Sequence, residues 1–168
     1  MMPATPSQTI GPYFHIGLPP FPGGSDPAPA GHPDTVTVHG YVRDGAGQPV
    51  PDALLEFWQG GAGFTGFARV PTDDDGHYTL RTLPPGGAPY VALCVFARGL
   101  THHLFTRVYF TLPENDPLLR TVPRERRGTL LAKPDGAGYR FDVHLRGEAE
   151  TVFLEPRAPK GRRGYPQR

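Results

Sequence analysis

Glycine and proline recur so often along this chain that they limit every regular element to a short length. The sequence holds 22 Gly and 22 Pro among 168 residues. Both residues break helices, whereas the aromatic residues, 11% of the chain, suit a pleated sheet. With 38% hydrophobic residues, the chain has enough apolar material for a core. The composition predicts an all-β fold of many short strands and excludes a helical bundle.

Cysteine and charge content narrow the class of protein further. Cys94 is the only cysteine, which excludes an internal disulfide and a cysteine-based zinc site and favours a reducing, cytoplasmic compartment. No apolar stretch approaches the roughly 20 residues that span a bilayer, so we expect no membrane association. Residues 156–168 hold five basic residues and no acidic one. Without aromatic platforms or a recognition helix, this tail is interpreted as a solvated, disordered end and not as a nucleic-acid binder.

The spacing of apolar residues predicts three parts. Residues 1–34 are rich in Pro and Gly and lack a periodic apolar pattern, which indicates an extended N-terminal arm. Residues 35–155 alternate apolar runs with turn sequences, as in an antiparallel β-sandwich, and residues 156–168 form the basic tail. The expected strands are 35–42, 53–58, 77–82, 90–97, 103–111, 129–133, 139–145 and 151–154, with a helical turn within 117–127.

Two segments are expected to contact other surfaces. The arm gathers Ile10, Tyr13, Phe14 and Ile16 within seven residues, and leaving that apolar surface in water costs about 25 cal/mol per Å². This part of the arm should therefore dock. The strand 90–97 is apolar on both faces, whereas a sandwich strand with one solvated face alternates. Another subunit, the arm, or both cover its second face, and the width of the apolar surface favours a subunit.

Residue types alone give few candidates for chemistry. None of the seven histidines forms a His-x-His pair, which would place two imidazoles on one face of a strand, so no metal site is predicted within the chain. Arg98 ends the most apolar strand, where a guanidinium can be held at the rim of a dry surface and aimed at a carboxylate. Its alternative role is that of a strand-end arginine that extends into water.

Several segments in a fixed order resemble the intradiol ring-cleaving dioxygenases, and among these the non-metal α chain of the two-chain enzymes. They are residues 5–18 (TPSQTIGPYFHIGL), 55–59 (LEFWQ), 95–99 (VFARG), 104–110 (LFTRVYF), 126–133 (RRGTLLAK), 139–142 (YRFD) and 147–153 (GEAETVF). The resemblance implies a β-sandwich of the prealbumin-like type and a higher αβ oligomer. It also implies O2-dependent cleavage of protocatechuate to 3-carboxy-cis,cis-muconate.

The same resemblance implies Fe(III) bound by two tyrosines and two histidines of a partner β chain, and by no residue of this chain. Where the iron chain has its histidine pair, residues 89–93 read PYVAL, and residues 60–71 contain no tyrosine. In the family, the α chain walls the active site of its partner. Carried over by motif, the substrate-binding residues are Thr9, Gly11, Pro12 and Tyr13 of the arm and Arg98, whose cation suits the substrate carboxylate.

Two other interpretations stay open. A non-catalytic, transthyretin-like β-sandwich binding module would share many of the turn sequences, but it has no use for the arm or for a doubly apolar strand. A homomeric dioxygenase would need an unusual set of iron ligands drawn from Tyr13, His15, Tyr90 and His103. The sequence offers no prearranged set of that kind.

Overall fold

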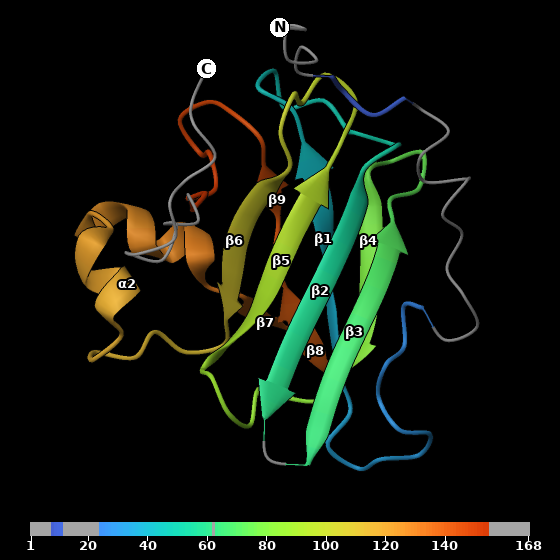
Figure 1. Ribbon diagram of the computed structural model, residues 1–168, viewed down its shortest axis with the longest axis vertical. Coiled ribbons are helices and arrows are strands. Elements are labelled where there is room, and N and C mark those ends of the chain that lie inside the picture. Colours follow the sequence, from blue (N-terminus) through green and yellow to red (C-terminus); the bar gives the residue numbers. More distant parts are fainter. Residues whose placement is uncertain (1–7, 12–23, 62, 155–168) are drawn as a thin grey trace, which may run out of the picture.

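The computed structural model describes residues 8–11, 24–61 and 63–154. Two β-sheets pack face to face as a sandwich, and a short helical segment lies beside β6 (Figure 1). The elements are β1 Val36–Arg43, β2 Leu54–Gly61, β3 Phe64–Pro71, β4 His77–Thr82, β5 Tyr90–Phe96, β6 Leu104–Tyr109, α2 Pro117–Thr121, the 3-10 helix η1 Arg124–Leu130, β7 Lys133–Asp135, β8 Gly138–Arg140 and β9 Val143–His144. Among the described residues, no helix is long and apolar enough to cross a membrane. The predicted all-β sandwich is confirmed.

The two sheets differ in strand direction. The first has the order β3-β2-β5-β6, and all of its neighbours are antiparallel. The second has the order β4-β1-β8-β7, and β9 also pairs with β1. Strand β1 is antiparallel to β4 but parallel to β8 and β9, so this sheet is mixed. Parallel neighbours need a long connection, and here the whole chain from β2 to β7 separates β1 from β8.

The core lies between the sheets and follows from the alternation of each strand. Its inward side chains include Val38, Val42, Leu55, Phe57, Leu80, Leu93, Val95 and Phe141. Tyr78 is buried among them, and its hydroxyl donates to the carbonyl of Phe141 at 2.5 Å. Burial raises the pKa of Tyr78, so the phenol stays neutral. The buried hydroxyl therefore has a hydrogen-bond acceptor, and its burial leaves no polar atom unsatisfied.

The structure differs from the sequence prediction in four places. The predicted strand 139–145 is divided into β8 and β9. Strand β3 was not predicted, because Gly66, Pro71 and the glycines just before the strand resemble a loop, yet it pairs with β2 along its full length. The predicted strand 129–133 is wrong: its first two residues end η1, where Leu130 is buried against Leu119 and Val122. The predicted strand 151–154 forms a bridge, between Leu154 and Phe105, and no strand. Isolated bridges hold these last two segments, Leu131 to Tyr109 in the first and Leu154 to Phe105 in the second, together with burial of Leu130 in the first.

The outward side chains of β2, β3, β5 and β6, called the outer face below, are largely apolar. They include Trp58, Phe67, Ala92, Cys94 and Phe105, with the ion pair of Glu56 and Arg69 between them. Trp58 is 52% exposed and Phe67 38% exposed. Burial, together with the nearby Glu56 carboxylate, raises the pKa of Cys94 to about 12. The predicted doubly apolar strand is therefore present, and its second face has exposed aromatic neighbours.

The described residues 24–26 join the free edges of the two sheets. The carbonyl of Gly24 accepts the N–H of Arg69 at 2.9 Å, and the carbonyl of Ser25 accepts the N–H of Arg81 at 2.9 Å. The Asp26 carboxylate also pairs with the Arg81 guanidinium at 2.5 Å. Since β3 and β4 are edge strands of different sheets, these bonds cover backbone groups on which another chain could add a strand. The division into arm, sandwich and tail stays a prediction.

Candidate functional site

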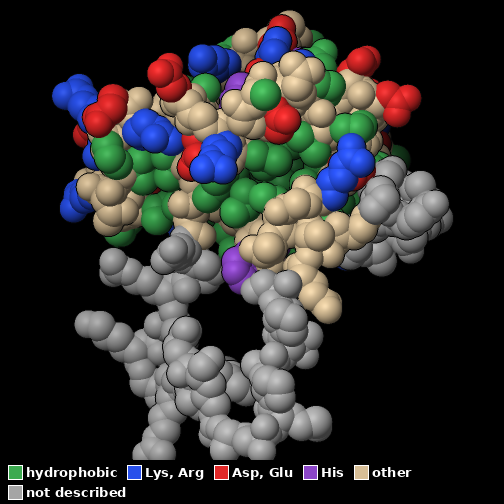
Figure 2. Space-filling view, turned by 90° about the horizontal axis from the view of Figure 1, so that it is seen from above, with side chains coloured by type: hydrophobic (Ala, Val, Ile, Leu, Met, Phe, Trp, Pro, Cys, Tyr) green, Lys and Arg blue, Asp and Glu red, His purple; other side chains and the backbone are tan. Residues whose placement is uncertain are grey.

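A tight turn between β5 and β6 presents Arg98 at one end of the sandwich. The N–H of Leu100 donates to the carbonyl of Ala97 at 3.2 Å and closes the turn. Gly99 occupies its third position with φ 83°, a left-handed conformation that favours glycine and is typical of a type II turn. The Arg98 side chain, at the second position, is 59% exposed. Figure 2 views this end of the molecule, where hydrophobic side chains gather with charged ones around them.

The N-terminal arm contacts this turn. The Thr9 hydroxyl accepts the N–H of Gly99 at 2.7 Å. The adjacent cavity has a volume of about 180 Å³ and is lined by Gln8, Ile10, Phe96, Ala97, Leu100, Thr101, His102 and His103. Gly11 faces open space, because no atom lies within 4 Å of the position that a Cβ would take. Two predicted site residues, Thr9 and Arg98, thus lie at one turn, whereas Pro12 and Tyr13 lie outside the described residues.

A buried carboxylate holds the Arg98 side chain. Asp52 lies in the connection from β1 to β2, and its Oδ2 is 3.1 Å from Nε of Arg98. The Asp52 side chain is only 6% exposed. Sequence reasoning missed this residue, because a Pro-Asp pair before a strand is typical of a solvated turn and carries no signal of burial. The guanidinium of Arg98 is therefore held in place and does not simply extend into water.

Replacing Thr9 by valine should loosen the arm at this turn. Valine keeps the shape of threonine but removes the acceptor of the Gly99 N–H, a bond worth about 1 kcal/mol. Amide hydrogen exchange of Gly99 should then become about fivefold faster, while Tm changes by less than about 2 °C. The control is Thr121→Val, which removes an exposed hydroxyl bond in α2. Unchanged exchange of Gly99 in the Thr9 variant would contradict this contact.

Residues 89–93, where the resemblance places the histidine pair of the iron-binding chain, do not fit a metal ion. The Arg107 guanidinium lies over the Tyr90 ring, 3.8 Å from its centroid, and 3.4 Å from Asp116. Burial raises the pKa of the neighbouring Tyr109 to about 12, and its hydroxyl donates to Asp116 at 2.9 Å. A guanidinium over the Tyr90 ring opposes binding of a further cation, and residues 89–93 contain no histidine.

Other candidate ligands do not change this result. Within the described ranges, no group of three or more His, Cys, Asp or Glu side chains is arranged to hold a metal ion. The His103 ring packs edge-on against Phe105, with 4.6 Å between centroids. Tyr13 and His15, which a homomeric dioxygenase would need, lie outside the described residues.

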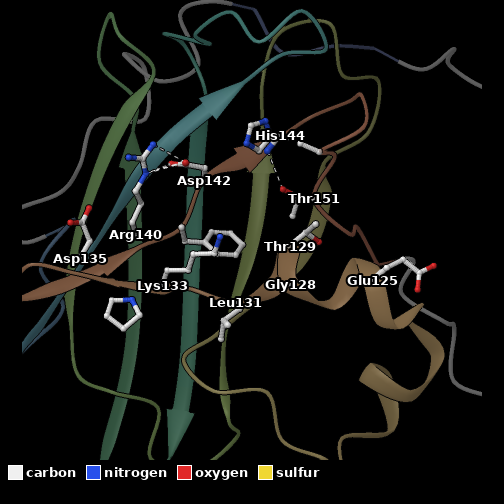
Figure 3. Close-up of a pocket in the computed structure, with 13 residues that line it drawn as sticks. Glu125, Gly128, Thr129, Leu131, Lys133, Asp135, Arg140, Asp142, His144 and Thr151 are labelled. Carbon is white, nitrogen blue, oxygen red and sulfur yellow. Dashed lines mark hydrogen bonds and ion pairs between the residues drawn. The ribbon is translucent and has the colours of Figure 1, made fainter.

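A larger cavity, of about 580 Å³, lies away from this turn (Figure 3). Its wall comes from η1, β7, β8, β9 and Thr151. Arg140 and Asp142 point toward one another there and form an ion pair of 2.9 Å. The Thr151 hydroxyl accepts the N–H of His144 at 3.0 Å. These polar groups satisfy one another, and none of the predicted site residues lines the cavity.

Comparison with known proteins agrees with the resemblance seen in the sequence. The chain is 40% identical to the protocatechuate 3,4-dioxygenase alpha chain of Burkholderia cepacia, over 90% of this chain and 96% of that protein. It is 37% identical to the alpha chain of Pseudomonas putida, over 92% and 98% of the two chains. The beta chain of Burkholderia cepacia is 27% identical over 70% of this chain and 67% of its own length. No family model matches the sequence.

Solved structures share the sandwich. The dioxygenase domain of a dioxygenase carbohydrate-binding protein fusion from Streptomyces sp. SirexAA-E superposes with a TM-score of 0.56 at 32% identity, covering 85% of this chain and 98% of that one. Catechol 1,2-dioxygenase from Acinetobacter sp. ADP1 has a TM-score of 0.51 at 20% identity, over 78% of this chain and 60% of that one, and shows the fold alone. The fold and the similar proteins together place this chain in the class of intradiol ring-cleaving dioxygenases. Within this class, the chain belongs to the family of protocatechuate 3,4-dioxygenase alpha chains.

Proposed function

We propose that this chain is the non-metal α subunit of an enzyme that cleaves protocatechuate with O2 between its two hydroxylated carbons. The product is 3-carboxy-cis,cis-muconate. The Fe(III) that supplies the oxygen chemistry belongs to the partner β chain, since the segment 89–93 of this chain does not fit a metal ion. The role of this chain is to bind and orient the substrate and to exclude water. These effects lower the activation free energy of ring cleavage although no group of this chain makes or breaks a bond.

The observation that carries this proposal is the placement of Arg98. It lies on a turn beside the arm residue Thr9, its side chain is 59% exposed, and its nearest approach to Asp52 is through Nε, at 3.1 Å. A planar guanidinium matches a carboxylate in a bidentate arrangement. Protocatechuate is a catechol with one carboxylate, so the exposed guanidinium would bind that group at the mouth of the partner's pocket.

The arm would supply the rest of the wall. Thr9 fastens it to the turn through the N–H of Gly99. Gly11 and Pro12 would let the backbone pass close to a flat ring, and Tyr13 would add an apolar face and one hydroxyl.

The outer face is the surface we propose for the partner β chain. The cores of interfaces are enriched in aromatic side chains and depleted of unpaired charges. Trp58 and Phe67 are exposed there, and the charges of Glu56 and Arg69 already pair at 2.6 Å. Several αβ units would assemble into a higher oligomer. The single cysteine, whose thiol has a raised pKa, is compatible with the cytoplasm.

Co-expression with a β chain tests this function directly. We expect this chain, purified alone, to carry neither iron nor protocatechuate-dependent O2 uptake, and the αβ complex to carry both. Iron and activity in the lone chain would overturn the non-metal role. Absence of activity from the complex as well would favour a non-catalytic sandwich.

A further inference from the structure

Asp52 is a buried carboxylate whose polar neighbours are engaged elsewhere. Thr72 Oγ1 accepts the N–H of Ala53 at 3.0 Å and donates to the carbonyl of Val50 at 2.7 Å. Neither carboxylate oxygen of Asp52 accepts a hydrogen bond from the described residues. Burying a carboxylate without a partner is costly, so its compensating charge is the Arg98 guanidinium.

The geometry of the pair leaves much of the guanidinium accessible. The nearest contact with Asp52 is made by Nε of Arg98, at 3.1 Å, and the Arg98 side chain is still 59% exposed. An arginine that is 59% exposed would otherwise sample many rotamers, and ordering it on binding costs up to about 2 kcal/mol. A pairing that fixes the guanidinium beforehand removes part of that cost.

We propose that Asp52 is a positioning residue, which holds Arg98 with its terminal nitrogens directed at the substrate carboxylate and thereby sets the preference for carboxylated catechols. This inference rests on the proposed function, because it gives Arg98 its orientation for the ligand proposed there. Since the Asp52–Arg98 pair has no net charge, recognition depends on oriented donors and not on long-range attraction. The carboxylate of Asp52 is buried, whereas the Arg98 side chain is 59% exposed, so a substrate carboxylate can reach the guanidinium from the solvent side.

The test is Asp52→Asn in the αβ complex, with kcat and KM measured for protocatechuate and for catechol. Asparagine keeps the shape of the side chain but loses the charge. We expect kcat/KM for protocatechuate to fall about tenfold, mostly through KM, and that for catechol to change less than about twofold. The assays are run at about 0.5 M salt, because the variant gains net positive charge and salt screens its attraction for the anionic substrate.

Two further variants separate positioning from a structural role. Asp26→Asn breaks another Asp–Arg pair, whose Arg81 lies on β4 beside Thr37 of β1 and not at the β5–β6 turn, and it should leave both substrates unaffected. In the background of Arg98→Gln, Asp52→Asn should cause no further loss of protocatechuate preference, because its effect passes through the guanidinium. The Tm of Asp52→Asn should stay within about 2 °C of the unmodified complex or rise, since a buried charge is removed.

The possible results distinguish this inference from the proposal on which it depends. If Arg98→Gln lowers protocatechuate preference and Asp52→Asn does not, the role of Asp52 is overturned and that of Arg98 stands. If Asp52→Asn lowers the rates with both substrates equally, its role is structural and the inference is again overturned. If Arg98→Gln itself leaves the preference unchanged, the carboxylate role of Arg98 fails, and the inference about Asp52 fails with it.

Discussion

Replacing Trp58 by aspartate should prevent the chain from assembling with the β chain proposed as its partner, while leaving the sandwich folded. The indole is 52% exposed in this chain and lies on the outer face beside Phe67, so it contributes little to the core. At an interface, truncating a buried tryptophan commonly costs 2 kcal/mol or more, which weakens binding at least about thirtyfold. A carboxylate in its place adds the cost of burying a charge. The mixed sample should therefore lack protocatechuate-dependent O2 uptake.

Assembly is measured by sedimentation of the two chains at micromolar concentration, and folding by the Tm of the chain alone. The matched control is Thr79→Asp, which adds the same charge to an exposed strand position on the outward side of the other sheet. That variant should assemble and turn over as the unmodified chain does. Normal assembly of Trp58→Asp would show that the outer face is not the partner's surface.

The sandwich was predictable because most of its strands alternate cleanly. In β1 and β4 the buried side chains recur at every second residue, as the sequence pattern requires. Strand β3 escaped prediction because Gly63 and Gly66 are typical of loops. Gly61, at the end of β2, shows why glycine is needed in this hairpin. A Cβ there would lie 2.6 Å from the Gly87 backbone, so the close packing of the two connections requires glycine. Such a contact between distant segments leaves no periodic signal in the sequence.

The candidate site was predictable only in part, for a similar reason. Arg98 could be selected because it ends a strand that is apolar on both faces, whereas Thr9 was selected only through the family resemblance of residues 5–18. Asp52 could not, because its burial depends on how the connection from β1 to β2 packs against a turn 46 positions later in the chain. Residue type and spacing predict exposure for an aspartate beside proline. The ion pair became visible only once the fold brought the two connections together.

Replacing Arg98 by glutamine should remove most of the enzyme's preference for a carboxylated catechol. Losing a charge-assisted, bidentate contact costs about 2 to 3 kcal/mol, which corresponds to a fall of about 100-fold in kcat/KM for protocatechuate. Catechol lacks the carboxylate, so its kcat/KM should fall less than about threefold. Glutamine is a better choice than alanine, because its amide can still donate toward the buried Asp52.

Both substrates are compared in the same αβ preparation, with iron content measured so that loss of metal is not mistaken for loss of recognition. Arg81→Gln serves as the matched control, since Arg81 also pairs with an aspartate but lies on β4 beside Thr37 of β1, in the other sheet. That variant should leave the ratio of the two kcat/KM values unchanged. Equal losses on protocatechuate and catechol in Arg98→Gln would mean that the arginine supports the turn or the interface, and that another cation, on the β chain, binds the carboxylate.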